Sequence, residues 1–141
     1  MNPENELMRK IEDAFFEYKE KYSIVEYSKV DEEQFLKIPE LGVYYQASKD
    51  SLITSYRIYY IGFDNFFPAP SEARGRFRDI YSIQDALKKL GAPVKKIPSI
   101  RIPGVNPTSP GYQFILNEKT ISFYYDPDTE VIRFVHTRIN Q

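Results

Sequence analysis

Apolar and polar residues alternate with a helical period in the first part of the chain. One helical face over residues 3–22 collects Leu7, Ile11, Ala14, Phe15, Tyr18 and Tyr22. Asn2 is a suitable N-cap and Pro3 is tolerated in a first turn, so the pattern predicts an amphipathic helix over 3–22. Beyond it, residues 24–27 indicate a short strand and residues 31–38 a short helical turn that ends before Pro39.

From Gly42 the period changes to that of a β-strand. Residues 42–47 and 51–63 are rich in β-branched and aromatic side chains, and the residues between them, 48–50, have turn chemistry, which predicts a β-hairpin. The more apolar face of its second strand should point to the core, namely Leu52, Thr54, Tyr56, Ile58 and Tyr60. The opposite face holds Ile53, Ser55, Arg57 and Tyr59.

A loop or edge segment and a second helix follow the hairpin. Pro68 and Pro70 cannot donate to a central sheet ladder, so residues 66–79 are predicted to lie outside the sheet interior. Ser82 and Asp85 have the spacing of a capping box, and Gly91 suits a helix terminus. These residues predict a helix over 82–90 with Ile83, Ala86, Leu87 and Leu90 buried.

The last third of the chain predicts a long connection and a three-stranded meander. Residues 92–111 contain five prolines and two glycines, which indicates a surface connection that either lines a site or simply crosses the fold. Alternating segments at 112–116, 120–125 and 130–138 are separated by turn residues. The sequence therefore predicts a single α+β domain over residues 1–141. Its antiparallel sheet would have about five strands, the hairpin plus the C-terminal meander, with two helices packed on one face.

Composition restricts the class of protein. The chain has no Cys, which excludes disulfides, thiolate metal sites and Cys nucleophiles. No apolar run reaches the length of a signal peptide or a membrane span, so we expect a cytoplasmic protein without membrane association. Aromatic residues make up 16% of the chain, twelve Tyr and ten Phe without Trp. Such a set predicts a Phe-rich core with Tyr on half-buried surfaces, as in ordinary sheets and in binding surfaces.

Charge is unevenly distributed although the net charge is only −1. Residues 1–50 hold twelve acidic and seven basic residues, whereas residues 72–101 hold eight basic and three acidic ones. The basic residues of the second region are Arg74, Arg76, Arg78, Lys88, Lys89, Lys95, Lys96 and Arg101. The region 74–101 suits a nucleic-acid or phosphate-binding module, and equally a solvated face. A pI of about 5.9 argues against the first reading.

No pattern of catalytic or metal-binding residues occurs. The single histidine, His136, lies in a predicted strand, where a structural role is the more common one. Asp126, Asp128 and Glu130 alternate as calcium ligands do, but without the glycine and the bidentate Glu of a calcium loop, so they indicate a turn. The sequence therefore predicts no enzyme, no cofactor and no metal. A carboxylate-dependent enzyme is the remaining alternative, because sequence does not reveal which acids lie together.

Three arginines form the sharpest candidate binding set. In an extended segment Arg74, Arg76 and Arg78 would project on one side, where guanidinium groups suit carboxylate or phosphate recognition. Replacing all three by Ala should then change stability by less than ~1.5 kcal/mol. Tyr45 and Tyr59 of the hairpin are the other candidate partner-binding residues, because Tyr and Arg are enriched at interface hot spots.

The layout from Phe66 to Val135 resembles that of a known family. The segments FFPAP, IYSIQDALKKLGAP, GYQFILNEKTISFYYD and VIRFV follow in the order found in immunity proteins of bacterial polymorphic and contact-dependent toxin systems. This resemblance covers about half of the chain. It implies an α+β domain that acts as a stoichiometric inhibitor of one cognate toxin in the cytoplasm of the producing cell. No toxin-contacting residue carries over, and the oligomeric state is not implied.

Overall fold

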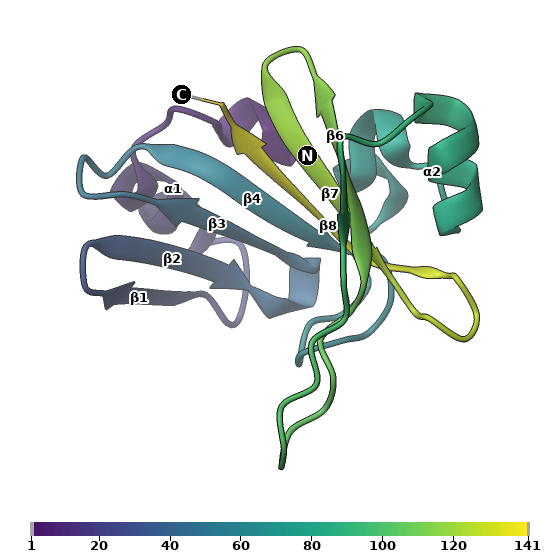
Figure 1. The fold of residues 1–141 in the computed structure, drawn as a ribbon. Helices are drawn as coiled ribbons and strands as arrows, with labels where there is room; N and C mark the ends of the chain where they lie inside the picture. Colours follow the sequence, from purple (N-terminus) through teal and green to yellow (C-terminus); the bar gives the residue numbers. More distant parts are fainter. Residues whose placement is uncertain (1, 141) are drawn as a thin grey trace.

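The computed structural model describes residues 2–140, whose strands form one antiparallel sheet (Figure 1). Eight strands are present in this part of the chain: β1 (Glu26–Val30), β2 (Glu33–Ile38), β3 (Val43–Ala47), β4 (Ile53–Tyr59), β5 (Lys95–Ile97), β6 (Gly111–Leu116), β7 (Lys119–Tyr125) and β8 (Ile132–Ile139). Their spatial order is β1-β2-β3-β4-β8-β7-β6-β5. The last strand, β8, thus pairs with β4 and joins the N-terminal strands to the C-terminal meander.

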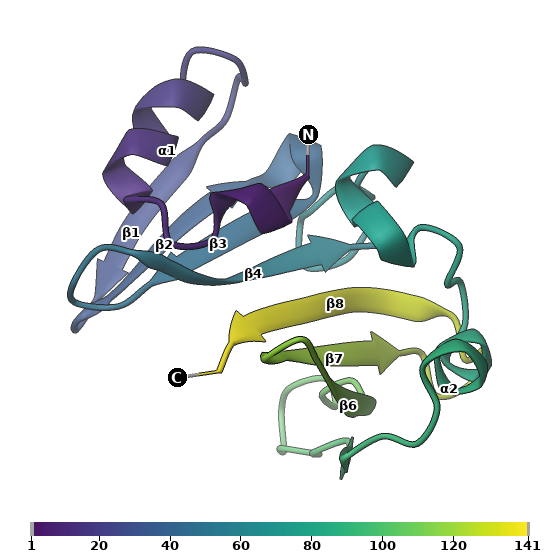
Figure 2. The same ribbon diagram turned by 90° about the horizontal axis from the view of Figure 1, so that it is seen from above.

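Helical segments accompany the sheet. They are α1 (Ile11–Tyr18), α2 (Ile83–Leu90) and the 3-10 segments η1 (Pro3–Glu6), η2 (Pro39–Leu41) and η3 (Ser71–Phe77). Figure 2 shows α1 beside the half of the sheet that contains β2 and β3, and α2 at the other half near β7. The α+β class and the antiparallel sheet are as predicted, but the sheet has eight strands rather than about five.

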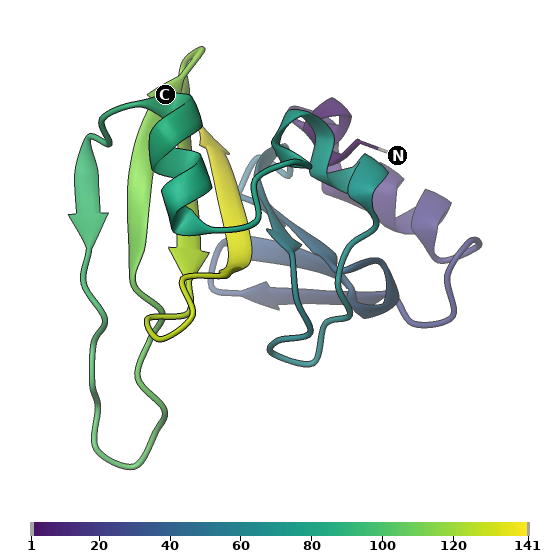
Figure 3. The same ribbon diagram turned by 90° about the vertical axis from the view of Figure 1, so that its right-hand side faces the viewer.

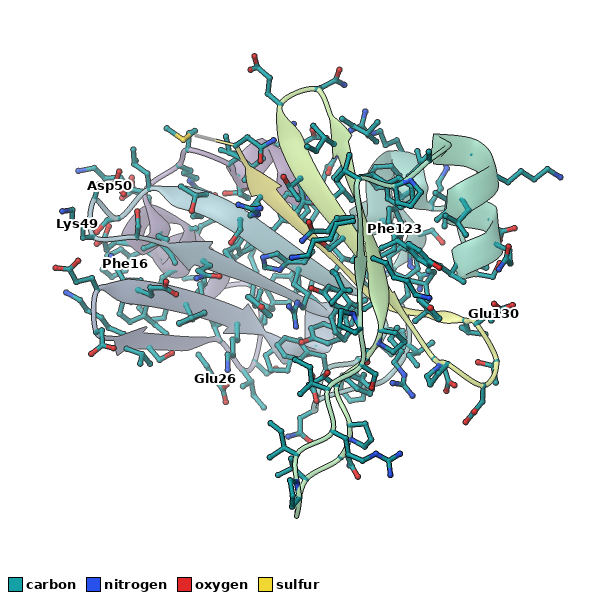
Figure 4. All side chains as sticks on the ribbon, in the orientation of Figure 1. Phe16, Glu26, Lys49, Asp50, Phe123 and Glu130 are labelled. Carbon is teal, nitrogen blue, oxygen red and sulfur yellow. The ribbon has the colours of Figure 1, made fainter. Side chains whose placement is uncertain are left out.

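The main core lies between the helical segments and one face of the sheet. Side chains from both α-helices, from η3 and from strands β2, β3, β4, β6, β7 and β8 belong to one hydrophobic cluster. The alternation along the strands places Tyr45, Ile58 and Phe123 on this face. Figure 4 shows Phe123 surrounded by other side chains near the middle of the fold, whereas Lys49, Asp50 and Glu130 lie at its periphery. A continuous core of this kind explains how a chain without disulfides stays folded.

The opposite face of the sheet carries a second, smaller cluster, which we call the aromatic face. It consists of Tyr44, Tyr59, Phe63, Phe66, Tyr124 and Phe134. The chain after β4 turns back over this face, where Phe63 and Phe66 exchange backbone hydrogen bonds and Ala69 N–H donates to the Tyr59 carbonyl. The high aromatic content is therefore divided between two apolar layers, one on each side of the sheet.

The predicted helix over residues 3–22 is divided into η1 and α1. Between them Met8 has a φ of 70°, and residues 8–10 pair with the start of β4 through Met8 N–H to the Ile53 carbonyl and Ile53 N–H to the Arg9 carbonyl. Asn2 caps η1 as expected, since its Oδ1 accepts the Glu4 N–H at 3.1 Å. The long-range backbone pairing outweighs the local helical pattern at residues 8–10, because it satisfies the same backbone groups.

The predicted helical turn at residues 31–38 is wrong, because residues 33–38 form strand β2. Gln34, Leu36 and Ile38 are buried in strict alternation, and Asp31, with a φ of 56°, forms the tight turn from β1. Gln34 is buried because its amide donates to the Ser48 carbonyl and to Ser51 Oγ. This polar core residue concealed the alternating pattern in the sequence.

The predicted core face of β4 is only partly correct. Tyr56, Ile58 and Tyr60 are buried in the main core, but Ile53 is there in place of Leu52 and Thr54. A register shift between Gln46 and Ala47 opposite this segment leaves Thr54 as the extra residue of a bulge. A bulge inserts one residue and so reverses the alternation on one side of it.

The second helix and the meander are as predicted. Ser82 Oγ accepts the Asp85 N–H and the Asp85 carboxylate accepts the Ser82 N–H, which completes the capping box of α2. Asn117 and Glu118, both with positive φ, join β6 to β7. The connection between α2 and the meander contains β5, a strand that the sequence did not predict and that pairs with β6 at the edge of the sheet. No helix within residues 2–140 is long and apolar enough to cross a membrane.

Candidate functional site

The three arginines of residues 74–78 do not form the extended row that was predicted. They lie on and beside η3, whose turns are interrupted at Gly75 with a φ of 58°. Arg74 is structural: its Nε donates to the Ala69 carbonyl, its Nη2 donates to the Tyr60 carbonyl, both at 3.2 Å, and its guanidinium lies 4.3 Å from the Tyr60 ring centroid. Arg76 and Arg78 are exposed. Only these two remain free to meet a partner.

Tyr45 and Tyr59 do not lie on the surface, which corrects the prediction that they contact a partner. Tyr45 is fully buried and stacks on Tyr18 with the ring centroids 6.0 Å apart. Tyr59 is 2% exposed and stacks on Phe66 at 4.3 Å. Burial raises the pKa of both hydroxyls, that of Tyr59 to about 12. Both faces of the hairpin are covered, so its tyrosines are core residues.

His136 lies on β8 against the aromatic face. Its Nδ1 accepts a hydrogen bond from Arg57 Nε at 3.4 Å, and the Tyr44 ring is 6.2 Å away. Burial, together with the charges of Arg57 and Arg138, lowers its pKa to about 3. The imidazole is therefore neutral at physiological pH and held in place as an acceptor.

Acidic side chains gather at turns. Asp126 Oδ1 accepts the N–H groups of Asp128 and Thr129, and its other oxygen accepts from Arg133, so this turn is fixed without a metal. These backbone N–H groups lower the pKa of Asp126. A second acidic set lines an open hollow of about 990 Å³ at the turns of the first strands: Asp31, Glu32, Glu33 and Asp50. Within residues 2–140 no group of three acidic or histidine side chains is placed to hold a metal ion.

The basic region 74–101 is distributed over several elements. Lys88 and Lys89 lie in the last turn of α2, Lys95 and Lys96 on the edge strand β5, and Arg101 in the loop beyond it. Residues 86–117 contain five of the basic residues and no acidic residue. The edge strand and the loop beyond it therefore present positive charge without an internal carboxylate to neutralise it.

The loop beyond β5 is the most prominent surface feature. Residues 98–108, which we call the arm, are all exposed, and Figures 1 and 3 show this segment extending beyond the ends of the strands. Its apolar side chains stand in solvent, with exposed fractions of 56% for Ile100, 53% for Ile102 and 61% for Val105. Side chains that large are usually covered when several occur on one small segment.

Hydrogen bonds within the arm fix its conformation. At the tip, Val105 N–H donates to the Ile102 carbonyl across Pro103 and Gly104, whose φ of 85° completes a type II turn. Below the tip, Thr108 N–H donates to the Ile100 carbonyl at 2.9 Å and Thr108 Oγ1 accepts the Ile100 N–H at 2.7 Å. The arm is thus a closed, hairpin-like projection.

The base of the arm is attached to the sheet by Arg133. Its Nη1 donates to Ser109 Oγ at 3.0 Å, its Nη2 donates to Asp126 Oδ2 at 3.2 Å, and its guanidinium lies 5.1 Å from the Phe63 ring centroid. Ser109 and Pro110 are buried, in contrast to the exposed residues before them. The arm therefore projects from a fixed root.

The sequence predicted a long surface connection over residues 92–111, but the arm within it was not selected as a candidate site, although it carried a usable signal. The tetrapeptide Ile102-Pro103-Gly104-Val105 has Pro and Gly at the two central positions that a type II turn requires. Arg57 was also missed as a site residue. The sequence signal for Arg57 is its position in the middle of a strand rich in Tyr and Ile. Only the sheet order shows which aromatic rings surround it.

Comparisons with known proteins give little beyond this geometry. No family model matches the chain, and no curated protein matches it. A solved structure with a partly similar arrangement is that of a DUF4309 family protein, YjgB, from Bacillus subtilis, with 12% sequence identity and a TM-score of 0.44. The match covers 82% of this chain and 63% of that protein, so the chain spans less than two thirds of its length.

Proposed function

We propose that this protein is an immunity protein, a cytoplasmic inhibitor that neutralises a cognate bacterial toxin by binding it in a stoichiometric complex. The observation that carries the proposal is the arm, which presents Ile100, Ile102 and Val105 to solvent from a fixed turn. The layout from Phe66 to Val135, which resembles immunity proteins, supplies the class of partner.

The arm is energetically suited to binding. Burying each of its three exposed apolar side chains against a partner stabilises a complex by up to ~1.5–3 kcal/mol. The Pro-Gly turn and the Thr108 hydrogen bonds fix the backbone before binding, so less conformational entropy is lost on association. A few side chains that become fully desolvated in well-packed pockets supply most of the energy of an interface, and the arm can present its apolar side chains in this way.

Charge near the arm specifies the partner further. Lys95 and Lys96 lie on β5, which leads into the arm, Arg101 lies in the arm itself, and the stretch 86–117 has no acidic residue. A complementary toxin surface would be an apolar groove with carboxylates at its rim. Such an arrangement increases the association rate and excludes basic partners.

The titrating groups favour binding over catalysis. The carboxyl groups of Glu17, Asp85 and Asp126 have lowered pKa values, because lysine, arginine or backbone N–H groups stabilise their charged forms. A carboxyl group that acts as a general acid needs a raised pKa instead. His136 is neutral and its Nδ1 accepts a hydrogen bond from Arg57, so this nitrogen is not free to accept a substrate proton.

The test is co-expression with a toxin encoded beside this gene. We expect a 1:1 complex and protection from growth arrest. Ile102→Ser combined with Val105→Ser should abolish both, whereas Ile24→Ser combined with Val30→Ser should not, because Ile24 and Val30 are equally exposed but lie away from the arm. A neighbouring toxin that neither binds nor is inhibited, or arm variants that protect normally, would contradict the proposal.

A nucleic-acid or phosphate-binding module is the second candidate. The acid-free stretch 86–117 favours it, as does the stacking of Tyr112 on Tyr125 beside Lys96 at the sheet edge. Affinity for a labelled single-stranded oligonucleotide should then fall by about 10³-fold or more between 50 and 200 mM salt if six phosphates are contacted. Binding that is absent or independent of salt removes this candidate.

A further inference from the structure

A cleft of about 680 Å³ lies between the aromatic face and the base of the arm. Strands β4, β7 and β8 provide its floor with Arg57, Tyr124 and Phe134, respectively. The remaining walls come from the loop after β4 and from both sides of the arm base: Phe63, Asp64, Ile97, Pro98, Ile100, Asn106, Pro107, Thr108 and Ser109. The volume is that of a small-molecule site, and the walls combine apolar side chains with several polar ones.

Arg57 is the cation of this cleft and is surrounded by aromatic rings. Its guanidinium carbon lies 4.3 Å from the ring centroid of Phe134, 5.3 Å from that of Tyr44 and 5.7 Å from that of Tyr124. The rings fix the guanidinium by cation–π contact and shield it from water on several sides. Arg57 is therefore only partly exposed, although it lines the cleft.

Arg57 forms no ion pair with any carboxylate among residues 2–140, although Asp64 also lines the cleft. Its Nε donates to Nδ1 of His136, which is neutral. A guanidinium has five N–H donors, so this one acceptor leaves donors for a ligand. A partly desolvated cation of this kind gains from an incoming anion.

We propose that this cleft binds a small organic monocarboxylate, whose carboxylate accepts hydrogen bonds from Arg57 and whose apolar body lies against Phe63, Ile97 and Pro107. Planar, charge-assisted pairing with carboxylates is the preferred chemistry of a guanidinium. Arg57 is the only basic residue that lines the cleft, and Asp64 lies in the same lining, so a doubly charged anion such as phosphate is disfavoured. This site does not depend on the proposed toxin binding.

The test uses phenylacetate and its neutral counterpart phenylacetamide as probes of the full chain. Each is added to the ¹⁵N-labelled protein up to about 10 mM, a concentration that saturates a site of millimolar affinity. Phenylacetate should shift the amide signals of Phe63, Asn106 and Thr108 and bind about tenfold tighter than phenylacetamide. Equal affinity of acid and amide, no binding, or shifts that map elsewhere would overturn the proposal.

Two variants separate the charge from the fold. Arg57→Gln should weaken phenylacetate binding about tenfold and leave phenylacetamide unchanged, whereas Arg78→Gln, an exposed arginine outside the cleft, should change neither. Asp64→Asn keeps the arginine cluster intact and should tighten phenylacetate binding about twofold, because it removes a repulsive charge. If Arg57→Gln fails to fold, Asp64→Asn decides: unchanged or weaker acid binding contradicts the site.

Discussion

Arg57 Nε lies 3.4 Å from His136 Nδ1, across the paired strands β4 and β8. The contact joins the N-terminal strands to the C-terminal meander on the aromatic face, where burial and the nearby arginines keep the only histidine of the chain neutral. The pairing of β4 with β8, which the linear pattern does not show, thus places the cation of the cleft beside a neutral acceptor.

The neutral state of His136 makes stability depend on pH. Its pKa is lowered from 6.5 to about 3 in the folded protein, so the unfolded chain binds more protons between these values. Titration of His136 therefore leaves the free energy of unfolding unchanged above about pH 6.5. Below that pH the free energy of unfolding decreases as pH falls, by at most ~1.4 kcal/mol per pH unit. Urea unfolding from pH 7.5 to 5 should show a shallower loss for His136→Asn, which keeps a hydrogen-bond acceptor, than for the native protein. Identical pH profiles would contradict this, because they would show that the pKa of His136 is the same in the folded and unfolded states.

Arg74 should be a stability residue and Arg78 should not. Arg74→Ala removes two charged hydrogen bonds and a cation–π contact and should cost about 2–3 kcal/mol. Arg78→Ala, the matched control, should stay within ~0.5 kcal/mol. The sequence predicted that replacing Arg74, Arg76 and Arg78 together by Ala changes stability by less than ~1.5 kcal/mol. From the structure we expect a larger loss of stability, almost all of it from Arg74. Chemical denaturation of both variants checks this, and equal costs would contradict the structural role of Arg74.

Gly42 should be irreplaceable. It has a φ of 71°, and an added Cβ would meet the Phe67 carbonyl oxygen and lie 2.6 Å from the Ala69 nitrogen, both rigid backbone atoms. Gly42→Ala should therefore cost more than ~3 kcal/mol or prevent folding. Gly104→Ala is the control, because Gly104 has a similar φ of 85° but open space around it, and should cost only ~1–2 kcal/mol. Thermal unfolding of the two variants separates the effect of the steric clash from that of backbone strain. A similar loss of stability in both would show that the structure around Gly42 relaxes to remove the clash.

The capping box of α2 should be detectable by itself. Ser82→Ala removes the acceptor for the Asp85 N–H, which lies 3.2 Å from Ser82 Oγ, and should destabilise the protein by ~1 kcal/mol. Ser82→Asp should restore most of this loss, because a carboxylate caps equally well. Equilibrium unfolding in urea measures both variants. Failure of Asp to rescue would mean that the hydroxyl acts through contacts other than the cap.

Local patterns were sufficient where neighbouring residues in the sequence decide the structure. Helix α2 needs only Ser82, Asp85 and the apolar stripe that follows, and the β6–β7 hairpin needs only its alternation and the turn at Asn117. The absence of Cys and of recognisable catalytic motifs likewise followed from the sequence alone. In each of these cases the physical cause acts over a few residues.

Tertiary structure decided the rest, because long-range pairing overrides local preference. The pairing of residues 8–10 with β4 divides the first helix, and the bulge beside Gln46 brings Ile53 into the core. The return of the chain over the second face of the sheet buries Tyr59, which alternation alone had placed on the surface.

The candidate sites divide in the same way. The turn at the tip of the arm depends on four consecutive residues, 102–105, so the local sequence determines it. The cleft required β4, β7 and β8 to lie side by side, which brings together residues as distant as Arg57 and Phe134. The sequence determines the chemistry of each side chain. The order of the strands determines which charged side chains lie close enough to form ion pairs, because the interaction between two charges depends on the distance between them.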